Sequence, residues 1–154
     1  MPVFRTSVAV AHTADNMFEL VSDFRHYPDF IRWFQSMKVT GEREVDGVRH
    51  SVGEAAVGFR GFSERFTTRV SADPASRRVE ANLVRGPFKH LQNVWEFTPE
   101  ADGTTRIDCM IDYEFSNFIL RMLAKNNFHI AVDKIMEAFL AEADRRYPRV
   151  SPSS

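Results

Sequence analysis

The chain lacks the features that fix disulfides, leaders and membrane spans. Cys109 is its single cysteine among 154 residues, so an internal disulfide is excluded and the composition is compatible with a reducing compartment. The first sixteen residues contain no basic stretch followed by a long apolar one, so no secretory signal is expected. No run of about 18 apolar residues occurs, so no helical membrane span is expected. These absences predict a cytoplasmic protein whose contact with the inner face of the membrane is at most peripheral and transient.

Motifs of catalysis and metal binding are missing as well. The five histidines include no pair at the i, i+4 spacing of a helical zinc site, and there is no cysteine cluster. The glycine patterns of dinucleotide sites, phosphate loops and nucleophile elbows do not occur. Asp23, His26 and Asp29 share a helical spacing, which favours local surface charge over a catalytic or metal role. The sequence therefore predicts a protein that is not an enzyme, with no metal and no cofactor.

Strong charge of either sign is also missing. Lys and Arg number 20 against 21 Asp and Glu, and the pI is near 6.5. Such a balance gives no general attraction for nucleic acid, so DNA is not expected as a partner.

What the chain has in excess is large apolar side chains: 14 Phe, 6 Met and 2 Trp against only 7 Gly. Four aromatic residues and a proline fall in YPDFIRWF, residues 27–34. Such a segment either plugs the end of an ordinary core or forms the mouth of a cavity for an apolar ligand. One helical face would carry Phe24, Tyr27, Phe30, Ile31 and Phe34. Trp33 would point away from that face, which favours the cavity.

The N-terminal third predicts one strand followed by two helices. Residues 4–10 alternate and are rich in β-branched side chains, as in a strand. Residues 13–24 carry a helical stripe, and Thr13 is a suitable N-cap. Residues 25–37 predict a second short helix with Pro28 in its first turn.

Six further strands and a long helix follow. The strands are predicted at 38–45, 48–59, 61–73, 77–84, 90–100 and 104–115, with turns at Asp46-Gly47, Asp73-Pro74, Gly86-Pro87 and Asp102-Gly103. Alternation assigns to the inward faces Phe62, Glu64, Phe66, Thr68, Val70, Val79, Ala81, Leu83, Leu91, Asn93, Trp95, Phe97, Thr105, Ile107, Cys109, Ile111, Tyr113 and Phe115. A helix over 117–147 would bury Phe118, Met122, Phe128, Val132, Ile135, Met136, Phe139 and Ala143.

These elements predict an α+β fold. A curved antiparallel sheet of about seven strands wraps around the long C-terminal helix, and the two short helices close one end. Residues 1–148 form a single domain, and 149–154 form a disordered tail.

Two polar positions leave a choice open. Glu64 lies among inward phenylalanines, and alternation puts His50 and Arg60 on one face with Val48, Val52 and Ala56. Glu64 either pairs with an arginine or lies exposed at a sheet end, or it contacts a ligand headgroup in an apolar cavity. An enzyme on the same fold would use Glu64, His50 and Tyr113 as its polar groups.

The order of these elements resembles the coenzyme Q-binding START-like family, including RatA-type members often labelled polyketide cyclase/dehydrase. The resemblance runs from residue 3 to residue 147 and rests on YPDF (27–30), FTTRV (66–70), GPFKHLQNVWEFTP (86–99) and IDYEFSN (111–117). It implies a helix-grip fold that binds ubiquinone or a similar polyprenyl lipid in support of quinone-dependent respiration. For RatA-type members it implies interference with ribosomal subunit association. The sequence departs from the family at Arg32 and Phe34, where a proline and a cysteine are common.

The site predicted for the ligand comprises Tyr27, Pro28, Phe30, Trp33, Phe34, Phe62, Glu64, Phe66, Leu83, Phe88, Lys89, Leu91, Trp95, Tyr113, Phe128, Val132, Ile135 and Met136. Phe88 either fills the core or gates the cavity, with Lys89 and His90 on a cationic rim. Three functions stay open: a lipid-binding protein, a cyclase or aromatase, and a ribosome-binding protein. Because acidic residues are interleaved with the basic ones, ribosome association is expected to be weak at physiological salt.

Overall fold

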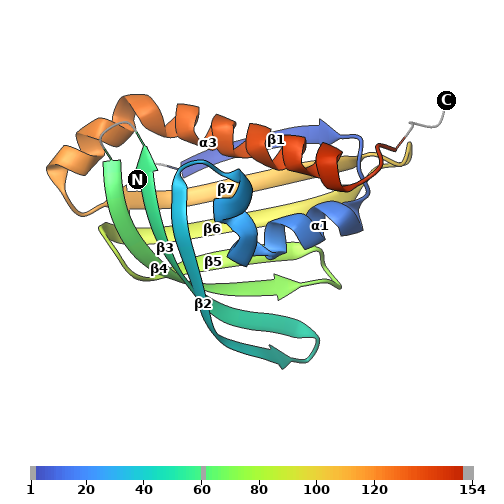
Figure 1. The fold of residues 1–154 in the computed structure, drawn as a ribbon, viewed down its shortest axis with the longest axis horizontal. Coiled ribbons are helices and arrows are strands. Elements are labelled where there is room, and N and C mark those ends of the chain that lie inside the picture. Colours follow the sequence, from blue (N-terminus) through green and yellow to red (C-terminus); the bar gives the residue numbers. More distant parts are fainter. Residues whose placement is uncertain (1–2, 60–61, 151–154) are drawn as a thin grey trace.

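The structure is a computed structural model that describes residues 3–59 and 62–150. Its elements in chain order are β1 (Val3–Val10), α1 (Ala14–Ser22), the 3-10 turn η1 (Phe24–His26), α2 (Tyr27–Phe30), β2 (Phe34–Val45), β3 (Val48–Phe59), β4 (Phe62–Asp73), β5 (Arg78–Arg85), β6 (Phe88–Pro99), β7 (Thr105–Phe115) and α3 (Phe118–Arg146). The seven strands form one antiparallel sheet in the order β1-β7-β6-β5-β4-β3-β2. The sheet curves, and α1 and α3 cover one of its faces (Figure 1). The predicted α+β fold is confirmed.

Local sequence accounts for where these elements begin and turn. The Thr13 side chain accepts a hydrogen bond from the Asn16 backbone N at 3.1 Å, and the Asn117 side chain caps α3 by accepting one from the Ile119 backbone N at 2.7 Å. Asp46 and Gly47 both have positive φ, 51° and 82°, as a two-residue hairpin turn requires. The predicted cap of α1 and the predicted turn are therefore confirmed.

The second short helix is much shorter than predicted. Residues 25–37 were expected to be helical, but the helix ends at Phe30 because Ile31 takes an extended conformation, with φ −105° and ψ 107°. Phe34 already pairs with Val57 in the sheet. The edge strand takes over these residues because sheet pairing satisfies their backbone groups.

The first turn of α3 and the tail also differ from prediction. Phe118 and Met122, which were expected to be buried, are 66% and 48% exposed, since the start of α3 projects past the strand ends (Figure 1).

Arg149 and Val150 were predicted to belong to a disordered tail. Instead, the Val150 backbone N donates to the Ala11 carbonyl at 2.7 Å, and Arg149 pairs with Asp144 at 3.2 Å. The rest of that tail, 151–154, lies outside the described residues.

The core lies between the helices and the concave face of the sheet, with Phe139 at its centre. This ring is 1% exposed and meets the rings of Tyr27, Phe30 and Trp95 at centroid distances of 5.2, 5.6 and 5.4 Å. Phe139 therefore ties α3 to both α2 and β6. In the described part of the chain, no helix is long and apolar enough to cross a membrane.

Candidate functional site

An apolar cavity of about 280 Å³ lies beneath α3 and reaches the surface. Its floor comes from β2 to β7, its roof from α3 and its closed end from α1 and η1. It is lined by Val21, Phe24, Tyr27, Trp33, Phe34, Met37, Ala55, Val57, Phe66, Thr68, Val70, Val79, Ala81, Phe88, Leu91, Asn93, Trp95, Ile111, Phe115, Leu123, Ala124, Asn127, Phe128, Ala131, Val132 and Ile135. The curved sheet leaves this space because the helix spans its concave face without filling it.

The cavity brings together a large part of the predicted site. Its lining includes Tyr27, Trp33, Phe34, Phe66, Phe88, Leu91, Trp95, Phe128, Val132 and Ile135. Whether these residues contact a ligand stays a prediction. Placed elsewhere are Pro28, Phe30, Glu64, Leu83, Lys89, Tyr113 and Met136. The side chain of Phe62 lies outside the described part of the structure.

The residues placed elsewhere have identifiable contacts. Phe30 packs on Phe139, and Met136 belongs to the same core cluster. Tyr113 stacks on Phe128 at a centroid distance of 3.9 Å and is not part of the cavity lining. The backbone of Glu64 pairs with that of Val57 near the start of β4, so Glu64 shares the concave face but is not part of the cavity lining.

The sequence prediction chose the wrong set of alternating residues of β3 for the inward face. The sequence grouped His50 with Val52 and Ala56, but Ala55 and Val57 line the cavity instead. The hairpin turn at 46–47 fixes this parity through the register, in which Ala55 lies opposite Phe66. This is also why sequence reasoning missed Ala55 and Val57 as lining residues. Arg60, grouped with His50, lies outside the described residues.

Phe88 lies in the cavity wall within a set of packed rings. It stacks on Phe115 at 4.6 Å and meets Phe66 edge-on at 5.7 Å. The predicted cationic rim is wrong at His90, because this residue points to the outer face and its Nε2 lies 2.8 Å from Asp112 Oδ1. Lys89, at a register shift in β6, is exposed.

Three polar side chains interrupt the apolar lining: Thr68, Asn93 and Asn127. Asn93 is engaged, since its Nδ2 donates to the Met110 carbonyl at 3.0 Å and its Oδ1 accepts from Trp95 Nε1 at 2.8 Å. Asn127 donates to the Leu123 carbonyl at 2.9 Å, and no described residue donates to its Oδ1. This oxygen is therefore available to a polar atom of a ligand.

The titratable groups near the cavity are held neutral by burial. Burial raises the pKa of the Cys109 thiol to about 12, so this side chain is the inert inward thiol that alternation predicted. Burial also raises the pKa of the Tyr27 phenol, which donates to the Val21 carbonyl, and that of Tyr113. Neither phenol is poised to transfer a proton near neutral pH.

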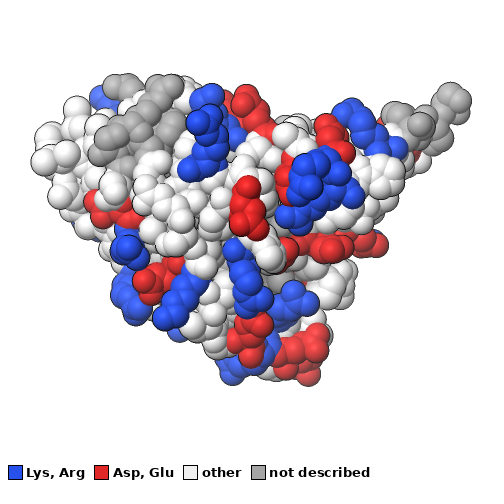
Figure 2. Space-filling view, in the orientation of Figure 1, with Lys and Arg blue, Asp and Glu red and all other residues white. Residues whose placement is uncertain are grey.

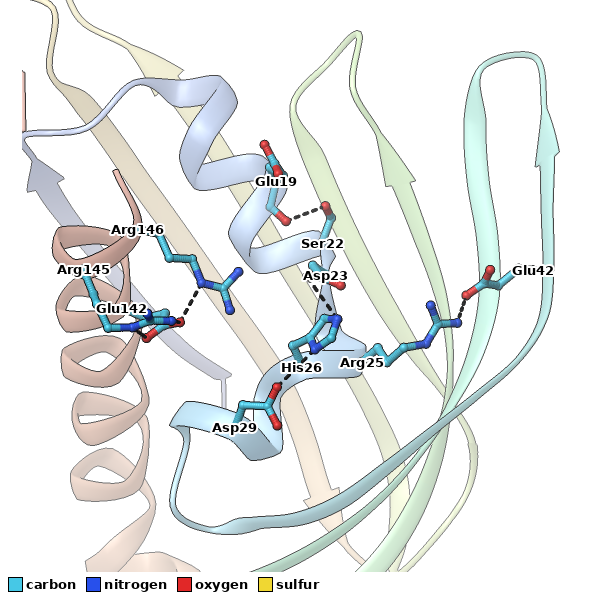
Figure 3. Close-up of polar contacts among 10 residues, drawn as sticks. All are labelled: Glu19, Ser22, Asp23, Arg25, His26, Asp29, Glu42, Glu142, Arg145 and Arg146. Carbon is cyan, nitrogen blue, oxygen red and sulfur yellow. Dashed lines mark hydrogen bonds and ion pairs between the residues drawn. The ribbon is translucent and has the colours of Figure 1, made fainter. Parts of the chain in front are cut away.

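A charged cluster lies at the closed end, where α3 ends. Figure 3 shows Arg145 and Arg146 converging on Glu142, beside η1 and α2. Their hydrogen bonds, at 2.9 Å from Arg145 Nε and 2.6 Å from Arg146 Nε, lower the pKa of Glu142 to about 2. The Arg146 guanidinium also lies 5.6 Å from the centroid of the Phe30 ring. These contacts hold the end of α3 against α2.

The predicted surface cluster lies beside it in Figure 3. His26 Nδ1 lies 3.1 Å from Asp29 Oδ2, and its Nε2 lies 3.9 Å from Asp23 Oδ2, all three side chains being exposed. The three residues thus form local surface ion pairs.

Replacing Gly53 with alanine should disturb the closed end of the cavity. A Cβ at this position would lie 2.6 Å from Cε2 of Phe24, a ring that is 9% exposed and lines the cavity. We expect a loss of about 1–3 kcal/mol in the free energy of unfolding, because the ring must move into the cavity. Urea titration measures this. The double variant Gly53→Ala/Phe24→Leu should recover part of the loss, and full stability of the single variant would contradict the account.

Comparison with known proteins finds a family and several relatives. The sequence model of a family described as "Polyketide cyclase / dehydrase and lipid transport" matches residues 10–140. Ribosome association toxin RatA of Escherichia coli is 30% identical over 148 residues, 96% of this chain and 90% of that protein. Coenzyme Q-binding protein COQ10 homolog B, mitochondrial, of Xenopus laevis is 29% identical over 95% of this chain and 59% of its own length.

Solved structures share the fold. The 18 kDa protein CC1736 of Caulobacter crescentus is 34% identical, with a TM-score of 0.81 over 94% of this chain and 97% of that one. A START superfamily protein of Mycobacterium smegmatis, 22% identical, has a TM-score of 0.80 over 94% and 99%. The Zhui aromatase/cyclase of a Streptomyces species, 20% identical, has a TM-score of 0.78 over 94% of each chain. Because the last two sequence identities are low, these two structures support a shared fold and nothing more.

Proposed function

This chain belongs to the polyketide cyclase / dehydrase and lipid transport family, and from that premise we propose that it binds ubiquinone or a related polyprenyl lipid without transforming it. The observation that carries the proposal is the cavity, whose lining has three polar side chains, Thr68, Asn93 and Asn127, among its 26 residues, the rest being apolar or aromatic. Burial of apolar ligand surface there contributes about 25 cal/mol per Å², so a prenyl chain needs no charged partner.

The size of the cavity bears on how such a lipid would sit. The cavity volume of about 280 Å³ is just below the roughly 300–1,000 Å³ that is typical of ligand pockets. A quinone ring with the first part of its tail matches that volume, and a long tail would continue through the opening. Asn127 Oδ1 accepts hydrogen bonds but cannot donate them, and the carbonyl and methoxy oxygens of the quinone ring also only accept. A water molecule would therefore have to bridge Asn127 Oδ1 and the ring.

The choice of quinone over other apolar ligands is supported by a relative. The protein named as coenzyme Q-binding aligns with 95% of this chain. On this basis we propose that the chain acts in quinone-dependent respiratory electron transport, as a lipid-binding or chaperone protein.

Titration with a water-soluble short-chain ubiquinone tests the proposal. Trp95 and Trp33 both line the cavity, so quinone binding should quench tryptophan fluorescence in a saturable way. Organic extraction of protein purified from cells should also yield bound quinone. Absence of both saturable quenching and extracted quinone would refute the proposal.

A cyclase function has less support from the geometry. Its polar groups would be Glu64, His50 and Tyr113, and none of the three lines the cavity. Tyr113 is 8% exposed and stacked on Phe128, while His50 points to the outer face. Turnover of a polyketide by the purified protein would nevertheless establish it.

A ribosome-binding function is the second candidate, because a relative 30% identical over nearly the whole chain is named a ribosome association toxin. Acidic residues pair with part of the positive charge that RNA would need, since Arg65 and Arg85 lie 4.0 and 3.9 Å from Glu54 and Arg106 lies 3.0 Å from Asp108. Weak association is therefore expected at physiological salt. A stoichiometric, salt-resistant complex in gradient sedimentation would favour this candidate instead.

A further inference from the structure

The first five residues of α3 include three apolar side chains that the core does not use. Phe118 is 66% exposed, Ile119 68% and Met122 48%. We call these three residues the α3 patch. Large apolar side chains scattered singly on a surface are ordinary, but three in five consecutive residues form a continuous patch, which is a candidate interaction site.

The other exposed apolar residues gather at the same end of the molecule. Val3 pairs with Asp112 near the end of β7, and Val84 lies next to the last residue of β5. Among the large hydrophobic residues described as exposed, Val45 is the exception, because it lies at the tip of the β2–β3 hairpin. In Figure 2 the left end of the molecule, where α3 starts, shows an area of uncharged side chains beside residues drawn in grey.

From the burial of the lining residues we infer that the cavity opens toward this end. Lining residues at the closed end, such as Val21, Val79 and Trp95, are buried. At the end where α3 starts, the lining residues other than Phe115 are half-buried, among them Phe88 and Phe128. Leu123 and Ala124 line the cavity directly after Met122, so the α3 patch continues into the cavity wall.

Positive charge flanks the patch. Lys125 follows one turn after Arg121 on α3, and Lys89 is the second residue of β6, at the same end, since Phe88 pairs with Phe115. Both lysines are exposed, and no described residue forms an ion pair with either. Arg121 is 3.9 Å from Glu114 and 41% exposed. Apolar side chains bordered by cations are the chemistry of a surface that lies on an anionic bilayer.

We propose that the α3 patch docks on an anionic lipid bilayer, with Phe118, Ile119 and Met122 inserted below the headgroups. The proposal rests on the proposed lipid binding, because docking would place the cavity opening against the membrane that holds the prenyl tail. A stable protein partner generally buries about 800 Å² on each side, far more than one helical turn offers. A bilayer has no such requirement, because lipid fits around any apolar side chain.

Vesicle co-sedimentation of the full chain tests the docking. We compare vesicles of phosphatidylcholine alone with vesicles of equal parts phosphatidylcholine and phosphatidylglycerol. The wild type should bind the mixed vesicles preferentially. The variant Phe118→Ser/Ile119→Ser/Met122→Ser should bind at least about tenfold less, because the apolar anchors are gone. Val45→Ser, at the opposite exposed site, is the matched control and should bind like the wild type.

The lysines are tested separately. Lys89→Gln/Lys125→Gln should lower binding to the mixed vesicles by roughly fivefold per lysine and leave the weak binding to phosphatidylcholine unchanged. Lys134→Gln, an exposed lysine further along α3, is its control. Equal binding of the wild type and the triple serine variant, or no binding of the wild type to mixed vesicles, would overturn the proposal.

Two further measurements separate the alternatives. In sedimentation without vesicles, the wild type should not self-associate through the α3 patch. If the wild type self-associates and the triple serine variant does not, the patch joins two copies of this chain and the docking proposal is wrong. Quenching by short-chain quinone, measured without vesicles, should be the same for the triple serine variant and the wild type. If neither the wild type nor the triple serine variant binds quinone, the proposed function is refuted, while the vesicle result still decides the docking.

Discussion

Replacing Phe139 with alanine is expected to lower the free energy of unfolding by about 3–5 kcal/mol, the usual cost of emptying a large aromatic site in a core. The ring is 1% exposed and touches rings from α2 and β6, so the vacated space lies between three elements that cannot collapse together. A domain of this size loses roughly 2–4 °C of Tm per kcal/mol, so the melting temperature should fall by about 6–20 °C. Thermal unfolding followed by circular dichroism measures it.

Phe118 on the same helix provides the matched control. Its ring is 66% exposed, and Phe118→Ala should change the free energy of unfolding by no more than about 0.5 kcal/mol. A small effect at Phe139, or equal effects at the two positions, would show that α3 is not held to the sheet through this ring.

The contrast between these two phenylalanines shows what the sequence could predict of the fold. Both lie on the helical period that predicts α3, and the period correctly gave the helix. Period alone does not tell where a helix projects past the sheet beneath it, because that depends on the strand lengths and their register. The same holds for residues 31–37, where helical spacing of aromatic residues gave way to pairing of Phe34 with Val57. The spacing of aromatic residues is a property of one segment. Whether that segment joins the edge of the sheet depends on a strand more than twenty residues away.

The candidate site was predictable in its aromatic part and not in its small residues. Large rings such as Trp95 and Phe128 attract notice in a sequence, and they do line the cavity. Ala55, Ala81 and Ala131 line it as well, and they help to make the space by not filling it. A short side chain leaves no sequence signal that separates a cavity wall from an ordinary close contact. Only the curvature of the sheet under α3 distinguishes the two.

Filling the cavity from one of these small positions should have the largest effect on ligand binding. Ala81 lies on the floor, paired with Val70 on one side and Asn93 on the other, and both of these neighbours also line the cavity. In Ala81→Phe the ring would occupy the space that we propose for the quinone. If about 110 Å² of ligand contact is lost, at about 25 cal/mol per Å², binding should weaken about 100-fold. Tryptophan quenching by short-chain ubiquinone measures this.

Stability separates exclusion of the ligand from damage to the fold. Because the new ring enters an existing space, Ala81→Phe should melt near or above the wild-type temperature, unlike an insertion into a filled core, which costs about 1–3 kcal/mol. Ala141→Phe, on the exposed face of α3, is the matched control and should keep wild-type quinone affinity. If Ala81→Phe binds quinone as the wild type does while remaining folded, the ligand does not occupy the cavity, and the proposed function must be sought on another surface. If it unfolds, Val57→Phe at the open end repeats the test, and unchanged affinity there would lead to the same conclusion.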